Sequence, residues 1–182
     1  MPTVDQPPRN TDPDAPTEHA GAGFLVGVGP GLVAGLLMLV VLCILALARD
    51  QALLEPAFVI ASVFMGPQAL AGGVGPAVVG LGLHFAISAA LGGLFAMLVG
   101  RTTRRRQLGL GMAYGVVIWL AVHLAFLPLA APHLGVTFGT VWPFFFGHLS
   151  YGLMLGASVP TTKGIDAPRR AYVDPLRREV RP

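Results

Sequence analysis

The chain has 182 residues, of which 54% are apolar and only 12% are charged, about half the charged share that is usual for soluble domains. Residues 56–100 and 107–162 carry no charge at all, which excludes an ordinary soluble fold and indicates an integral membrane protein. The net charge is +3, but the arginines lie at the ends of the apolar runs, as membrane topology explains, so we expect no nucleic-acid partner. A single cysteine, Cys43, excludes a disulfide framework within one chain.

The N-terminal region is predicted to be a tail followed by a membrane span. Residues 1–22 are rich in proline and charge and offer little to bury, which predicts a disordered cytoplasmic tail. The apolar run 24–48 is about twice as long as the core of a secretory signal, so we interpret it as a retained transmembrane helix. Its glycines Gly27, Gly31 and Gly35 recur every fourth residue, a spacing that predicts close packing against another helix.

A short apolar run separates the first two predicted spans. Residues 57–65 are too few to cross a bilayer, and Gly66-Pro67 ends the run, so a short interfacial or half-inserted helix is expected. The second predicted span covers residues 76–100 and starts at a proline, which suits a first helical turn. Four arginines end it and are predicted to fix its topology: Arg101, Arg104, Arg105 and Arg106.

Two further spans are predicted, over residues 108–131 and 141–159. In the third, Gly111 and Gly115 form a small-residue pair, and Pro128 frees the carbonyl of Leu124. The fourth opens with an aromatic cluster typical of the membrane interface, and Gly152 and Gly156 give it a close-packing face. Residues 162–182 are predicted to form a basic cytoplasmic tail.

The predicted fold is therefore all-α: an integral membrane bundle of four transmembrane helices plus one short interfacial or half-inserted helix, within a single domain over residues 23–161. With both termini in the cytoplasm, eleven of the twelve basic residues lie inside and Arg49 alone lies outside, which agrees with the positive-inside rule. The lipid bilayer is the expected partner, and a second copy of the chain or another membrane protein is left open.

Three histidines lie inside predicted spans. Counted from the cytoplasmic end of each helix, His84, His123 and His148 lie at depths of roughly 25, 24 and 22 Å, in the outer half of the membrane. Each has a polar or aromatic neighbour one turn away on its own face, namely Ser88, Trp119 and Tyr151. The sequence thus predicts one polar site built from His84, His123, His148 and Tyr151.

The chemistry of such a site has several interpretations. Three imidazoles are suitable ligands for a transition metal, two facing ones for haem, and any of them can exchange a proton. Alternatively, each imidazole makes one interhelical hydrogen bond, for example to the carbonyl freed by Pro128, and fixes helix register. No carboxylate lies between residues 56 and 165 to complete a catalytic set.

We therefore expect a non-catalytic membrane protein with a histidine-based metal or proton site. The alternatives are a haem- or metal-dependent membrane redox enzyme that uses His84, His123 and His148, and a small transporter subunit. Nucleotide chemistry finds no motif to support it. The substrate, the metal and the oligomeric state do not follow from the sequence.

Three segments, LHFAISAALGGLFA, GMAYGVVIWLAVHLAFLPL and PFFFGHLSYG, resemble the corresponding parts of the YagU-like bacterial inner-membrane proteins. That family consists of small polytopic chains with no established activity. The resemblance spans about residues 83–152 and is carried by His84, by His123 with Pro128, and by the triplet Gly147-His148-Leu149. It implies a location in the bacterial inner membrane and points to the same three histidines, but it implies no reaction.

Overall fold

The computed structural model describes residues 15–100, 102–134 and 138–160, and all the regular secondary structure in them is helical. The elements in chain order are α1 (Ala15–Leu47), α2 (Glu55–Met65), the 3-10 turn η1 (Pro67–Ala71), α3 (Val74–Val99), α4 (Arg104–Ala121), the π-helical segment η2 (Val122–Phe126), α5 (Leu127–Ala130), the 3-10 turn η3 (Pro132–Leu134) and α6 (Phe138–Ser158). For these residues, the predicted all-α class is confirmed.

Three helical segments of the described chain are long and apolar enough to cross a membrane: Gly23–Leu47, Val74–Val99 and Arg104–Ala130. The third combines α4, η2 and α5. Helix α6, the fourth predicted span, is 21 residues long but is not among the three. Its sequence is less apolar because it carries glycines, His148 and Tyr151 on a face that is buried against the other helices.

Two helix starts differ from the predictions by four residues or more. Helix α1 begins at Ala15, so residues 15–22 are helical and do not belong to the disordered tail that we expected there. Pro16 at the first turn favours this earlier start, because proline lacks only an N–H that a first turn leaves unpaired. Residues 1–14, residues 162–182 and Arg101 lie outside the described residues.

Helix α4 begins at Arg104, ahead of the predicted start at residue 108, so three arginines form its first turn and do not lie in a loop. Cations are unfavourable at a helix N-terminus. Arg104 offsets this cost by acting on another helix: its Nη1 donates to the carbonyls of Gly156 at 3.0 Å and Val159 at 3.3 Å, and to that of Ala157. Its guanidinium thereby caps the C-terminus of α6, where a cation is favourable.

We expect Arg104→Gln to lower the stability of the bundle by about 1 kcal/mol, because the last carbonyls of α6 lose a cationic donor. Arg105→Gln removes the neighbouring charge, which is exposed and makes no such contact within the described chain, and is the matched control. Thermal unfolding of both variants in one detergent measures the difference. Equal losses in the two variants would show that net charge matters and that the cap does not.

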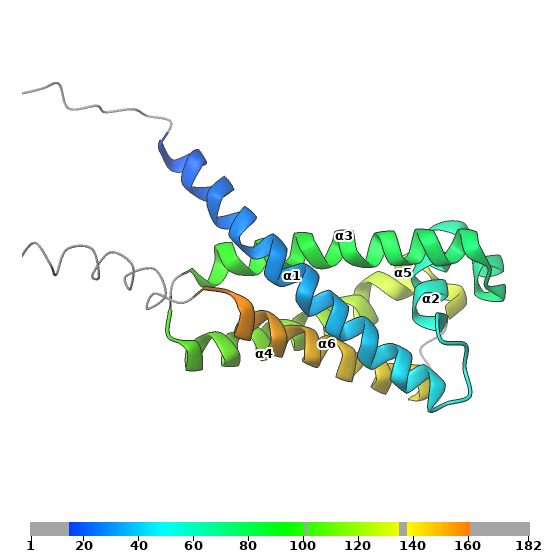
Figure 1. Cartoon of the computed structure of the whole chain (residues 1–182). Coiled ribbons are helices and arrows are strands. Elements are labelled where there is room, and N and C mark those ends of the chain that lie inside the picture. The colour runs from blue at the N-terminus through cyan, green and yellow to red at the C-terminus, as the bar shows by residue number, and fades with distance from the viewer. Residues whose placement is uncertain (1–14, 101, 135–137, 161–182) are drawn as a thin grey trace, which may run out of the picture.

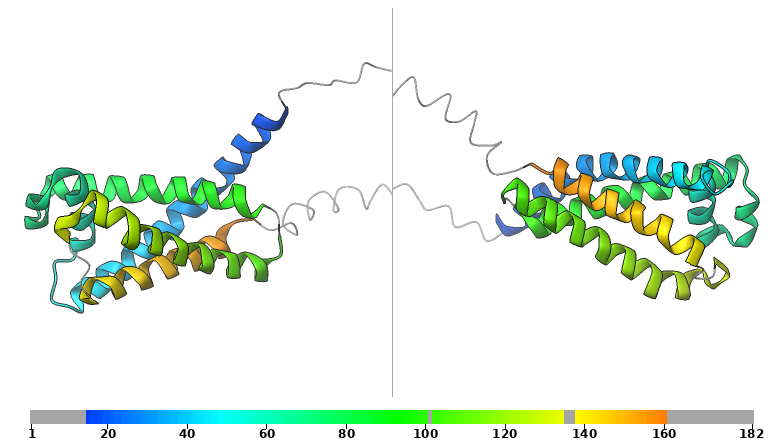
Figure 2. Two further views of the ribbon diagram at one scale, coloured as in Figure 1. Left: turned by 180° about the vertical axis from the view of Figure 1, so that it is seen from behind. Right: turned by 90° about the horizontal axis from the view of Figure 1, so that it is seen from below.

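The helices form an open bundle whose order in space differs from their order in the chain. Helix α1 packs along both α3 and α6, and α6 packs along α4, whereas α3 and α4 make few direct contacts (Figure 1). The end of α3, the start of α4 and the end of α6 lie together at one end, which we call the arginine end. Helices α2 and α5 lie at the opposite end, as the views from behind and from below also show (Figure 2).

The predicted glycine faces lie at these contacts. A Cβ atom at Gly27 or Gly31 would overlap the backbone of Gly92 on α3, and one at Gly35 would overlap the Ser88 side chain. On the other side of the bundle, four glycines bring α4 and α6 together: Gly111 and Gly115 on α4 meet Gly152 and Gly156 on α6. Backbone therefore contacts backbone in two places, and these contacts hold α1 to α3 and α4 to α6.

Candidate functional site

A cavity of about 170 Å³ lies between α3 and η2, in the half of the bundle away from the arginine end. Its polar lining consists of His84 and Ser88 from α3, His123 from η2, and His148 and Tyr151 from α6. The other lining side chains are apolar and come mainly from α1, α2, α3 and η2. The four residues predicted from sequence to form a polar site thus line one cavity, from three separate segments of the chain.

All three imidazoles are buried, with exposed fractions of 5% for His84, 6% for His123 and 8% for His148. His148 lies within electrostatic reach of both other histidines. Since no Asp or Glu occurs between residues 56 and 165, this part of the chain supplies no carboxylate that could neutralise a charged imidazole. The cavity is therefore suited to neutral histidines.

His84 is oriented by a hydrogen bond to another helix. Its Nε2 lies 2.9 Å from the carbonyl oxygen of Gly35 on α1. Because a carbonyl only accepts, Nε2 carries the proton and donates it, and Nδ1 of the neutral ring is left as an acceptor. Gly35 is thus part of the site as well as of the helix contact: its carbonyl accepts from His84, and a Cβ atom on it would overlap the Ser88 side chain.

His123 and His148 share a different arrangement. Each Nδ1 donates to the carbonyl four residues earlier in its own chain segment, His123 to Trp119 at 3.1 Å and His148 to Phe144 at 2.7 Å. By the same argument, Nε2 of each neutral ring is unprotonated and can accept a hydrogen bond. The site therefore presents three imidazole nitrogens as acceptors.

The π-helical segment η2 carries His123, and Pro128, which comes two residues after its end, explains why it forms. Pro128 has no N–H to donate to the helix, and η2 lies directly before it, with the N–H of Leu127 bonded to the carbonyl of Val122. We suggested a bond from a histidine to the carbonyl freed by Pro128, but His123 bonds to Trp119. The Trp119 ring also lies against the His123 ring, with 5.3 Å between their centroids.

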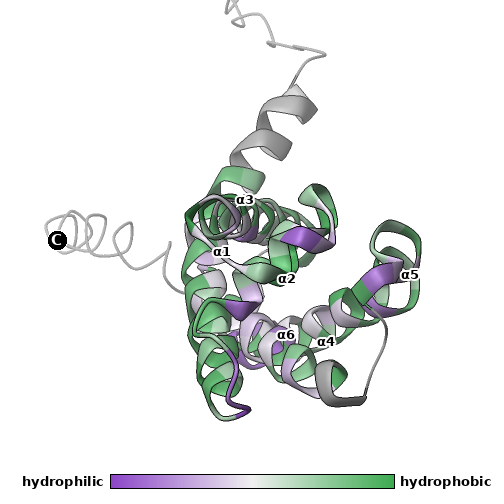
Figure 3. Cartoon of the chain, turned by 90° about the vertical axis from the view of Figure 1, so that its right-hand side faces the viewer, coloured by the Kyte–Doolittle hydropathy of each residue, from purple (hydrophilic) through white to green (hydrophobic). Residues whose placement is uncertain are grey.

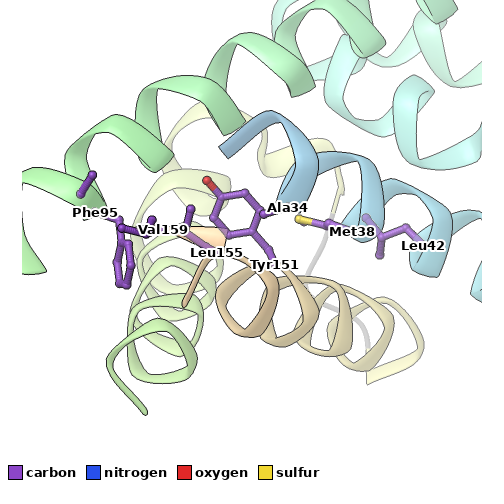
Figure 4. Close-up of a cluster of buried hydrophobic side chains, with 8 residues drawn as sticks. Ala34, Met38, Leu42, Phe95, Tyr151, Leu155 and Val159 are labelled. Carbon is purple, nitrogen blue, oxygen red and sulfur yellow. The ribbon is translucent and has the colours of Figure 1, made fainter. Parts of the chain in front are cut away.

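Tyr151 lines the cavity and links α6 to α3. Its hydroxyl donates to the carbonyl of Ser88 at 2.8 Å, and the side chain is 2% exposed. Figure 4 shows it among buried side chains, with Ala34 and Leu155 in the same cluster. The Tyr151 hydroxyl is therefore used in a structural bond, and the tautomer of His148 is set by the Phe144 carbonyl instead.

We expect Tyr151→Phe to destabilise the bundle by about 1 kcal/mol, because it removes a buried interhelical hydrogen bond without changing the packing volume. Tyr114→Phe removes a similar bond, from the Tyr114 hydroxyl to the carbonyl of Leu91 at 3.0 Å, in a less buried place, and should cost less. Melting temperatures in detergent rank the two. The opposite order would contradict the role of Tyr151 as the main link between α6 and α3.

Among the residues that the structure describes, no three His, Cys, Asp or Glu side chains are grouped so that they could hold a metal ion. The geometry thus gives no support to the transition metal that we considered for His84, His123 and His148. What the residues offer is a set of hydrogen-bond acceptors in an apolar cavity. His133 is exposed and does not line the cavity, and its Nε2 lies 3.3 Å from Ser62 Oγ.

Helix α2 is the part of the site that sequence analysis missed. Val59, Ile60, Val63 and Phe64 all line the cavity. A signal was present on α3, where four small or polar residues recur every fourth position and are all buried: Gly80, His84, Ser88 and Gly92. A Cβ atom at Gly80 would overlap the carbonyl of Ala57, so this row of residues packs against α2 at one end and against α1 at the other.

Comparison with known proteins places the chain in a family. A model described as a family of unknown function (DUF6789) matches residues 22–169. Neither the curated proteins nor the solved structures contain a significant match. The matched range includes every polar residue that lines the cavity and nearly all of the described bundle. This chain therefore belongs to DUF6789, a family of unknown function.

Proposed function

We propose that this protein is a non-catalytic integral membrane protein that binds a membrane-soluble molecule with a hydroxyl head group in the histidine-lined cavity. One observation carries the proposal: three buried imidazoles, each bonded to a backbone carbonyl through one nitrogen, line a cavity that is otherwise almost entirely apolar. The head group would donate to an imidazole, and the apolar part would fill the rest of the cavity.

The imidazoles that line the cavity favour a ligand that can donate a hydrogen bond. In an apolar cavity, a ligand that brings an O–H to a hydrogen-bond acceptor gains more free energy than one that brings only apolar surface. The Tyr151 hydroxyl is not available as a donor to the imidazoles, because it donates its hydrogen bond to the backbone carbonyl of Ser88. Since the cavity suits neutral imidazoles, the ligand keeps its proton and donates a hydrogen bond to a ring nitrogen.

The position of the cavity favours a ligand that arrives from the bilayer. Phe64 and Phe126 line the cavity and are also 64% and 46% exposed, so the cavity reaches the outer surface of the bundle beside them. In the view along the bundle, α2 and α3 lie on one side and α4 and α5 on the other (Figure 3). Most of the ribbon of α2 and α3 in this view has the colour of hydrophobic residues (Figure 3).

The membrane placement is part of the proposal. We infer four spans with α6 as the fourth, because α6 is 21 residues long, or roughly 32 Å at 1.5 Å per residue, and packs along α1 and α4. Cytoplasmic termini follow from the arginines, since Arg104, Arg105 and Arg106 lie at the end of the bundle where α1 starts. The resemblance to YagU-like proteins supports a bacterial inner membrane. No described contact favours the redox-enzyme or transporter alternatives.

The test compares two probes that differ in one donor, 4-hexylphenol and its methyl ether, 4-hexylanisole. Equilibrium dialysis of the full chain in lipid nanodiscs against empty nanodiscs corrects for partition into lipid. We expect the phenol to bind about tenfold more tightly, because only the phenol donates to a buried imidazole. Equal affinities would show that the histidines do not select a donor, and no saturable binding of either probe would overturn the proposal.

A further inference from the structure

The open side of the bundle has a second hollow at the arginine end. It measures about 510 Å³ and lies between the last turns of α3 and the first turns of α4. The side chains of Leu98, Leu110 and Val117 make its walls apolar, while Thr102 and Arg106 lie at the end where α3 stops and α4 begins. Because α3 and α4 make few direct contacts, no helix of the described chain fills the space between them.

This hollow is separate from the histidine cavity. Tyr114 lines the hollow and donates its hydroxyl proton to the carbonyl of Leu91, whose side chain lines the cavity. Phe95 lies against the Tyr114 ring, with 5.2 Å between centroids, and also lines the hollow. Tyr114 and its two partners therefore form a partition between the two spaces.

The charge at the mouth of the hollow is positive and uncompensated within the described chain. Arg106 is exposed, and no described Asp or Glu pairs with it. Arg104, two residues earlier, is engaged at the end of α6, so among the described residues Arg106 is the cation that lines this hollow. A positive mouth above an apolar groove is complementary to a molecule with an anionic head and a hydrocarbon tail.

We propose that the hollow binds an anionic phospholipid from the cytoplasmic leaflet. Its phosphate lies at Arg106 and Thr102, and one acyl chain follows Leu98 and Leu110 down to Tyr114. Basic sites between transmembrane helices on the cytoplasmic side are suited to such head groups. A second copy of the chain fits less well, because a symmetric contact through this face would bring the two Arg106 side chains together.

The test measures which lipids stay on the full-length protein. The protein is mixed with equal amounts of dioleoylphosphatidylglycerol and dioleoylphosphatidylcholine in detergent, and bound lipid is counted by native mass spectrometry. We expect the anionic lipid to be retained preferentially. Arg106→Gln should reduce that preference about fivefold, which corresponds to one cationic contact, and Arg105→Gln should leave it unchanged.

A second pair of variants tests the acyl-chain part of the site. Ala113→Phe fills the hollow without changing charge and should displace the lipid, whereas Ala90→Phe, at an exposed position that lines neither space, should not. The proposal would be overturned by equal retention of both lipids, by equal effects of the two arginine variants, or by unchanged lipid retention in Ala113→Phe. Competition by inorganic phosphate alone would assign the site to a free anion, and a dimer that forms without lipid would assign it to a second copy.

Discussion

Gly111→Ala should lower the stability of the bundle by about 1–3 kcal/mol, whereas Gly109→Ala on the same helix should leave it unchanged or raise it slightly. The added Cβ at Gly111 would overlap the carbonyl of Gly152 on α6, where backbone meets backbone and neither helix has a flexible side chain to move. At Gly109 the same atom meets open space. Thermal unfolding of the two variants in one detergent measures the contrast directly.

The contact between α1 and α3 can be tested independently with the same kind of variants. Gly27 meets the carbonyl of Gly92 on α3, while nothing lies near Gly29. A loss of stability in Gly27→Ala without one in Gly29→Ala would extend the conclusion to the α1–α3 contact. If the two variants of each helix had the same melting temperature, the helices would not approach as closely as described. The histidine cavity would then lose the geometry on which its function rests.

Replacing His123 and His148 together by phenylalanine should abolish the preference for 4-hexylphenol over 4-hexylanisole. Phenylalanine keeps the ring volume and removes both acceptor nitrogens, while each ring gives up only a bond to a carbonyl of its own segment. The single variants should each reduce the preference only in part, because the remaining imidazoles still accept. Dialysis of the nanodisc-embedded variants against the two probes provides the measurement.

His133→Gln is the control for this experiment, since His133 lies outside the cavity and should leave both affinities unchanged. His84→Phe should act differently, because it breaks the bond to Gly35 on α1 and should lower stability as well as binding. A double variant that still preferred the phenol would mean that the donor is recognised by another group. Ser88, which also lines the cavity, would then be the next candidate.

Residue counts from the charged ends of the apolar runs predicted one level for the three histidines, and in the structure all three line one cavity. The contact faces were also predictable, since Gly27 and Gly31, Gly111 and Gly115, and Gly152 and Gly156 are pairs with the four-residue spacing that places both members on one side of a helix. These signals are local and need only a helical rise and period. They account for the three histidines lining one cavity.

The open side of the bundle was not predictable from local signals. That α3 and α4 stay apart, and that α2 covers part of the cavity, depends on which helix each glycine face selects. The tautomer of His84 was not predictable for a similar reason, since its acceptor lies on α1, 49 residues away in the chain. The early start of α4 follows from Arg104 reaching the end of α6, a contact that no pattern around residue 104 indicates.

The most direct test of the histidine-lined cavity as a binding site is photolabelling of the full-length protein with a 4-hexylphenol analogue that carries a diazirine at the end of its tail. With its head at the imidazoles, the tail should label residues at the opening, above all Phe64, Val122 and Phe126, and excess 4-hexylphenol should prevent the labelling. Label spread over the lipid-facing side of α1, for example at Leu36 and Val40, with no competition by the phenol, would contradict the account.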